Sequence, residues 1–119
     1  MAGPTGSSAK KKVLVIEDDA EIREILADTL MIDGYPVETA GSGPEGMAWL
    51  RANPAPGLVL LGLTSTETSM FLSHLGPLGA IPVVVLSMPD DPTVFPGAAE
   101  VLAKPFDMEL FLNLVARYC

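Results

Sequence analysis

The feature of this sequence that most constrains its fold is a series of five short apolar runs, each followed by a more polar segment. The runs occupy residues 13–16, 36–40, 58–61, 82–86 and 101–103. The first, third and fourth are continuous apolar stretches, as expected for strands that are buried on both faces. Strands that alternate with helical segments predict βαβ units with helices on both faces of a parallel sheet. We therefore expect a three-layer α/β domain.

Two of the segments that follow these runs, the first and the last, have apolar residues spaced to form one face of a helix. The first begins after Asp18 or Asp19, either of which can cap it, and ends at Gly34. Its apolar positions have amphipathic helical spacing. They are Ile22, Ile25, Leu26, Thr29 and Leu30. The last segment of the chain follows Asp107, a second capping candidate. Its expected inward positions are Leu110, Phe111, Leu114, Val115 and Tyr118.

The two middle helices are predicted to begin at capping boxes. Ser42 is followed three residues later by Glu45, and Thr64 by Glu67. The apolar residues expected inside the second of these helices are Met70, Phe71, Leu72 and Leu75. The segment 87–97 contains three prolines and a glycine. These residues disfavour a helix, so we expect the fourth helix to be short or irregular.

Length, charge and cysteine content limit the classes of protein to which the chain can belong. Its 119 residues suit one domain, with a flexible lead-in at 1–10 and the domain at 11–119. A net charge of -8 disfavours nucleic acid as a partner. No run approaches the roughly 18 apolar residues of a membrane helix, so no membrane partner is expected. The one cysteine, Cys119, allows no internal disulfide, which fits a cytoplasmic protein.

The candidate functional residues follow the ends of the predicted strands. In open parallel sheets, ligands bind in a crevice outside the carboxyl ends of the strands. The residues in those places are Glu17, Asp18, Asp19, Gly62, Leu63, Thr64, Ser87, Lys104 and Pro105. Acidic, hydroxyl and basic side chains are thus expected at one edge of the sheet.

These motifs, in this order, resemble the receiver domain of bacterial two-component response regulators. The segments that carry the resemblance are VLVIEDD, LVLLGL, IPVVVLS and GAAEVLAKPFD, and it covers residues 12–119. It implies a CheY-like, flavodoxin-like fold with a five-stranded sheet of order 2-1-3-4-5. Family members transfer a phosphoryl group to an aspartate after the third strand. An acidic pair holds Mg²⁺ there, and a hydroxyl and a lysine bind the phosphoryl oxygens.

Matched position by position, the resemblance assigns four residues to this phosphorylation pocket but leaves out its acceptor. Glu17 and Asp18 correspond to the acidic pair, Ser87 to the hydroxyl and Lys104 to the lysine. The acceptor position falls on Gly62, which has no side chain that could be phosphorylated. We therefore expect no catalytic residue and no enzymatic activity.

The switch position of the family also differs in this chain. The aromatic residue that the family carries on the fifth strand corresponds to Val101. We therefore expect a degenerate pseudo-receiver that acts as a phosphorylation-independent protein-interaction module in phosphorelay signalling. The resemblance implies that it binds a signalling protein or a second copy of itself. The expected face combines the fourth-helix region, the fifth strand and the last helix.

Other interpretations of the same residues remain open at this point. Glu17 and Asp18 could bind Mg²⁺ weakly, although we expect no cofactor and favour a structural role in which Asp18 pairs with Lys104. A non-standard acceptor could support Mg²⁺-dependent phosphotransfer. A small ligand or cation could enter the acidic crevice where Gly62 leaves room. His74 and Cys119 are expected to be exposed and to have no role in the site.

Overall fold

The computed structural model describes residues 10–76, 80–87, 95–104 and 107–119. Five strands are present: β1 (Val13–Glu17), β2 (Val37–Ala40), β3 (Leu58–Gly62), β4 (Val83–Ser87) and β5 (Glu100–Ala103). The helices of the described residues are α2 (Ala20–Ile32), α3 (Gly43–Ala52), α4 (Ser65–Leu75) and α5 (Met108–Tyr118). Each strand lies within one or two residues of its predicted place.

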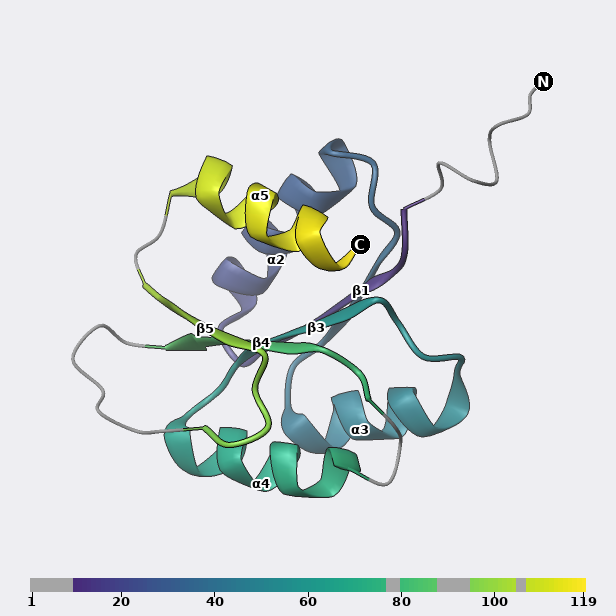
Figure 1. Ribbon diagram of the computed structural model, residues 1–119, viewed down its shortest axis with the longest axis vertical. Coiled ribbons are helices and arrows are strands. Elements are labelled where there is room, and N and C mark those ends of the chain that lie inside the picture. Colours follow the sequence, from purple (N-terminus) through teal and green to yellow (C-terminus); the bar gives the residue numbers. More distant parts are fainter. Residues whose placement is uncertain (1–9, 77–79, 88–94, 105–106) are drawn as a thin grey trace.

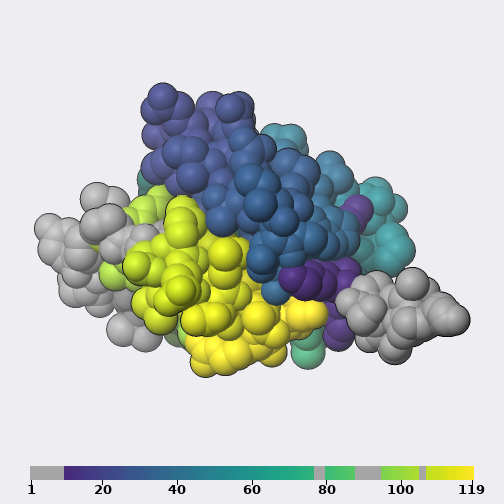
Figure 2. Space-filling model, turned by 90° about the horizontal axis from the view of Figure 1, so that it is seen from above, coloured from purple at the N-terminus to yellow at the C-terminus, as the bar shows by residue number. Residues whose placement is uncertain are grey.

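The strands form one parallel sheet in the order β2-β1-β3-β4-β5. Helices α2 and α5 cover one face of the sheet, and α3 and α4 cover the other (Figure 1). Figure 2 views the first of these faces and shows α2 and α5 packed side by side. The expected three-layer α/β fold and strand order are confirmed.

The core consists of two layers, one on each face of the sheet. Alternate residues of β1 supply the two layers because successive side chains of a strand point to opposite faces. Val13 and Val15 pack toward α2 and α5, and Leu14 and Ile16 pack toward α3 and α4. All four side chains are fully buried. The central strands are therefore anchored from both sides, which fixes the positions of their carboxyl ends.

The predicted helix starts are confirmed, with one difference in detail. Asp19, rather than Asp18, caps α2, and Asp107 caps α5. Thr64 and Glu67 form the complete capping box of α4. Ser42 caps α3, but the carboxylate of Glu45 accepts a hydrogen bond from the backbone N–H of Gly41, 2.9 Å away, and not from that of Ser42.

Three residues that were expected to face the core lie on the surface instead. Ile25 is 55% exposed, Met70 56% and Leu110 56%. Each stands at the margin of the apolar stripe of its helix, and the sheet covers only the centre of that stripe. Helical spacing alone therefore overestimated the width of the buried face.

The two ends of the described chain meet near the amino edge of the sheet. The ammonium group of Lys10 lies 4.4 Å from the centre of the Tyr35 ring and bonds to the backbone carbonyl of Asp33. Cys119 is half-buried against the core layer under α2 and α5, so the expectation of an exposed thiol is wrong. Its burial raises the pKa of the thiol.

Some expectations concern residues outside the described ranges. These are the lead-in at 1–9, most of the proline-rich segment (88–94) and Pro105. Among the described residues, His74 is exposed, as expected. None of the helices in the described ranges is long and apolar enough to cross a membrane.

Candidate functional site

The carboxyl ends of β1, β3, β4 and β5 surround a cavity of about 230 Å³. The five residues matched to the phosphorylation pocket all line it, and they are Glu17, Asp18, Gly62, Ser87 and Lys104. The other lining residues are Leu63, Thr64, Ser65, Val85, Leu86 and Phe95. Residues from four strands and their following loops thus meet at the edge that the sequence predicted.

Glu17 and Gly62 are direct neighbours across the β1–β3 ladder. Successive residues of a strand point to opposite faces of the sheet. Glu17 therefore falls on the same face as Val13 and Val15, and Gly62 on the same face as Leu58 and Leu60. Both positions therefore belong to the α2 and α5 face of the sheet. This shared register brings the Glu17 side chain alongside the Cα atom of Gly62.

The carboxylate of Glu17 fills the space that a side chain at position 62 would need. A Cβ atom added to Gly62 would lie 3.0 Å from the Glu17 carboxyl carbon and would overlap one of its oxygens. Glu17 is only 1% exposed. The Glu17 carboxylate thus occupies the space directly beside the Gly62 Cα atom, and the open part of the cavity lies next to it.

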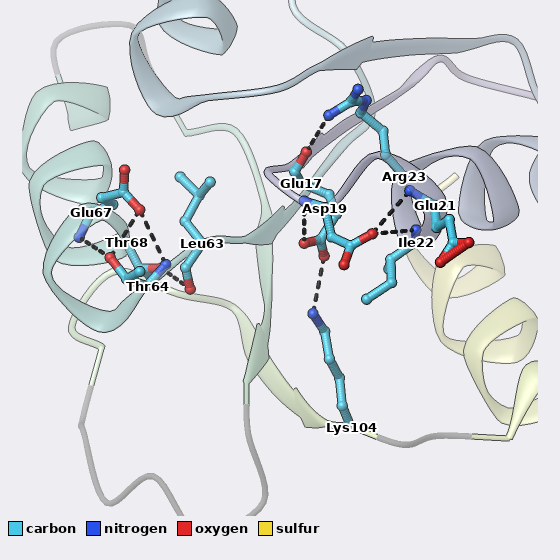
Figure 3. A network of polar contacts seen from close by, with 10 residues as sticks. All are labelled: Glu17, Asp19, Glu21, Ile22, Arg23, Leu63, Thr64, Glu67, Thr68 and Lys104. Carbon is cyan, nitrogen blue, oxygen red and sulfur yellow. Dashed lines mark hydrogen bonds and ion pairs between the residues drawn. The ribbon is translucent and has the colours of Figure 1, made fainter.

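Lys104 and the start of α2 hold this buried carboxylate (Figure 3). The Lys104 ammonium group lies 3.0 Å from Glu17 Oε1, and the backbone N–H of Asp19 donates to Oε2 across 3.2 Å. The guanidinium of Arg23 donates to the Glu17 backbone carbonyl at 2.8 Å. The ion pair of Lys104 is therefore made by Glu17, where the sequence led us to expect Asp18.

Burial raises the pKa of the Glu17 carboxyl above the ordinary value of a glutamate. The hydrogen bond from Lys104, the backbone N–H of Asp19 and the positive charge of Lys104 act in the opposite direction, but loss of hydration is the largest effect. An ionised carboxylate is costly in this position, and Lys104 offsets only part of that cost.

The donor set does not fit the Mg²⁺ site of the receiver family. Glu17 is turned toward Lys104, Asp18 is exposed, and Gly62 offers no carboxylate. Within the described part of the chain, no three acidic, histidine or cysteine side chains are placed to share a metal ion. Mg²⁺ keeps several waters and is bound through one or two carboxylates, and of the three acidic positions of the family only Asp18 presents an exposed carboxylate here.

The remaining predicted residues are held by local contacts. The backbone N–H of Lys104 donates to the carbonyl of Ser87 at 2.7 Å, which fixes the two residues beside each other. The hydroxyl of Thr64 donates to Glu67 Oε1 at 2.9 Å and accepts the Glu67 backbone N–H at 3.2 Å. Val101, at the switch position, is 50% exposed.

Two contributors to the site were missed from the sequence. Phe95 lines the cavity from the end of the proline-rich segment, and Arg23 reaches the carbonyl of Glu17 from α2. Arg23 lies one helical turn beyond the cap residue Asp19, so its proximity to the strand end could have been anticipated. No local pattern points to Phe95, because its place depends on tertiary packing.

The chain is similar in sequence to curated response regulators, although no protein-family model matches it. It is 34% identical over 124 residues to the response regulator protein FleR of Pseudomonas aeruginosa, covering 90% of this chain and 24% of that protein. It is 33% identical over 116 residues to a CpxR homolog, a transcriptional regulatory protein of Haemophilus influenzae, covering 88% of this chain and 49% of that protein. The chain thus spans half or less of the length of these relatives.

Solved structures share the fold. The receiver domain of a signal transduction histidine kinase from Syntrophus aciditrophicus matches with a TM-score of 0.78 and 24% identity, over 91% of this chain and 89% of that one. Chemotaxis protein CheY4 of Vibrio cholerae matches with a TM-score of 0.77 and 24% identity, over 93% and 100% of the two chains. Together with the sequence relatives, this shared fold identifies the chain as a CheY-like receiver domain of the two-component response regulator type.

Proposed function

We propose that this receiver domain is degenerate and acts in the cytoplasm as a phosphorylation-independent protein-interaction module. The observation that carries the proposal is Gly62 at the end of β3, where the neighbouring Glu17 carboxylate takes up the space of a side chain. A glycine cannot accept a phosphoryl group. The domain then signals by being bound, without a chemical step of its own.

In this proposal the domain needs no metal ion and is not an enzyme. Receiver phosphorylation depends on a cation that offsets the charge of the transferring group. Here Glu17 bonds to Lys104 and to the Asp19 backbone, which supports a structural role for it. Thr64 and Glu67 hold the start of α4, which argues against either of them as a substitute acceptor.

The partner is a signalling protein or a second copy of the chain, bound at the face formed by β5 and α5. Large apolar side chains stand exposed on these two elements, and they are Val101, Met108 and Leu110. The fourth-helix region of the same expected face lies mostly outside the described residues. Nucleic acid is not proposed as a partner of this domain, because a net charge of -8 opposes a phosphate backbone.

The proposal is tested by incubating the protein with Mg²⁺ and acetyl phosphate and measuring its intact mass. We expect an unchanged mass, because the position that accepts the phosphoryl group in related domains has no nucleophile. A receiver protein that carries the acceptor aspartate serves as the positive control and should gain one phosphoryl group.

A phosphoryl adduct on this chain would overturn the proposal. Peptide mapping of such an adduct would then identify the acceptor. Adduct formation that depends on Mg²⁺ and disappears in an Asp18→Asn variant would establish phosphotransfer through a non-standard residue instead.

A further inference from the structure

Glu17 is held by polar contacts at both of its carboxylate oxygens at the edge of the receiver cavity. Its side chain comes from β1 but lies beside Gly62 of β3 and reaches Lys104 after β5. Both carboxylate oxygens have partners, at 3.0 Å for Lys104 and 3.2 Å for the Asp19 backbone N–H. One side chain thus connects three strand ends that flank the cavity.

The charge balance of the cavity depends on this contact. Lys104 is the only basic residue among the described residues that line it, and its ammonium group is neutralised by Glu17. Asp18 also lines the cavity and is exposed. An anion that enters therefore meets an acidic side chain and no free cationic partner, and a charge-assisted hydrogen bond from Lys104 is already in use.

We propose that Glu17 is an internal ligand of Lys104 that lines the receiver cavity and keeps the Lys104 ammonium group from binding tetrahedral anions there. This inference rests on the proposed function and adds how anion binding at the same site is prevented. The ion pair holds the ends of β1, β3 and β5 in one arrangement without a phosphoryl group. The carboxylate takes the space of the absent side chain at position 62 and also supplies the negative charge that Lys104 binds.

Removal of the internal ligand should convert the cavity into an anion site. In a Glu17→Ala variant, the Lys104 ammonium group loses its carboxylate partner and faces the cavity, which measures about 230 Å³ with Glu17 in place and which Ser87 and Thr64 also line. We expect inorganic phosphate to bind this variant at least about tenfold more tightly than the unchanged protein, since one charge-assisted hydrogen bond is regained. A phosphate titration followed by amide chemical shifts of the strand-end residues measures both affinities.

The control is Asp18→Ala, which removes the same charge from an exposed neighbour that the structure does not pair with Lys104. This variant removes a repulsive charge but leaves Lys104 paired, so it should gain less affinity than Glu17→Ala, and adding Lys104→Ala to Glu17→Ala should abolish the gain. Equal phosphate affinities for the unchanged protein, Glu17→Ala and Asp18→Ala would overturn the inference. The titration uses no phosphoryl donor, so its failure would leave the result with acetyl phosphate unaffected.

A stability measurement tests the same contact without a ligand. Gly62→Ala should lower the urea midpoint in the unchanged background, because the Glu17 carboxylate must turn away from Lys104 to make room for the new methyl group. The same substitution should cost much less when Glu17 is already alanine. Gly76→Ala, whose added Cβ meets nothing within 4 Å, is the matched control and should cost little in either background. Equal costs of Gly62→Ala in both backgrounds would contradict the inference.

Discussion

Glu17 combines two opposing contributions to stability within a single side chain. Its carboxylate loses nearly all contact with water, and it gains an ammonium group and a backbone N–H in exchange. The raised pKa indicates that the loss of hydration is the larger of the two. The folded protein therefore binds a proton at Glu17 more readily than the unfolded chain does.

This balance predicts a specific pH dependence. A carboxyl whose pKa is raised on folding contributes stability below its unfolded pKa and loses that contribution as the pH rises through the folded pKa. The unfolding free energy of the unchanged protein should therefore fall, relative to that of Glu17→Gln, as the pH rises above the ordinary glutamate range. Urea titrations of both proteins at several pH values measure this difference.

Glu24→Gln makes the same charge change at an exposed position and is the reference for these titrations. The groups that face the Glu17 carboxyl are Lys104, the backbone of Asp19 and the side chain of Asp18, which also raises the pKa of Glu17. A Glu17→Gln protein that loses stability relative to the unchanged protein as the pH rises would show that the ion pair outweighs the cost of burial.

The positions of the candidate site could be read from the sequence, but the contacts between them could not. Glu17, Asp18, Gly62, Ser87 and Lys104 follow strand ends, so topology alone brings them to one edge. The choice of Glu17 over Asp18 as the partner of Lys104 depends on side-chain alternation and on a glycine across the ladder. That combination becomes visible only when the register of β1 and β3 is known.

At the level of elements, the close approach of α3 to the sheet depends on Gly46. A Cβ atom at this position would lie 2.8 Å from Ile16 Cγ1 of β1 and closer still to its Cδ1. Ile16 is fully buried, so its side chain has little freedom to move away. The glycine thus sets the distance between helix and strand.

Two effects of opposite sign compete in a Gly46→Ala variant. Alanine should stabilise a helix interior by about 1 kcal/mol relative to glycine. Overpacking a close-packed core costs about 1–3 kcal/mol. We expect the second effect to win and the urea midpoint to fall.

Ala48→Gly, at an exposed position of the same helix, isolates the propensity effect and should cost about 1 kcal/mol. A Gly46→Ala protein that is more stable than the unchanged one would mean that α3 shifts outward without loss of packing.

The helices and strands themselves were largely predictable because their signals are local. Capping residues such as Thr64 with Glu67, and the continuous apolar runs of the strands, define their own elements. The extent of burial was less predictable. Ile25, Met70 and Leu110 fit a helical apolar face and are nevertheless exposed, because the sheet contacts only part of each helix.

For the molecule as a whole, the dominant electrostatic property is an excess of negative charge. Its 15 acidic residues outnumber 7 lysines and arginines, which gives the net charge of -8. Self-repulsion of this kind destabilises a compact state and is screened by salt. The exposed ion pairs among the described residues, such as that between Arg117 and Glu100 at 3.0 Å, offset little of it because exposed pairs contribute little.

We therefore expect the melting temperature at neutral pH to rise with sodium chloride. Between about 0.01 M and about 0.15 M salt the screening length falls from about 30 Å to about 8 Å. Replacing part of the sodium chloride by millimolar MgCl₂ at constant ionic strength should not raise the melting temperature further through Asp18. If MgCl₂ did raise the melting temperature and Asp18→Asn removed that rise, a specific cation site would lie at this edge of the sheet.

The overlap between the Glu17 carboxylate and any Cβ atom at position 62 also affects how mutational scans of this domain should be interpreted. A library that varies position 62 alone would contain only substitutions that require the Glu17 carboxylate to turn away from its place beside Lys104, so the score of each would include the loss of that contact. Varying position 17 at the same time removes this contribution. Combinatorial libraries of the two positions would separate a packing constraint from a signalling constraint, which single-site scans would merge.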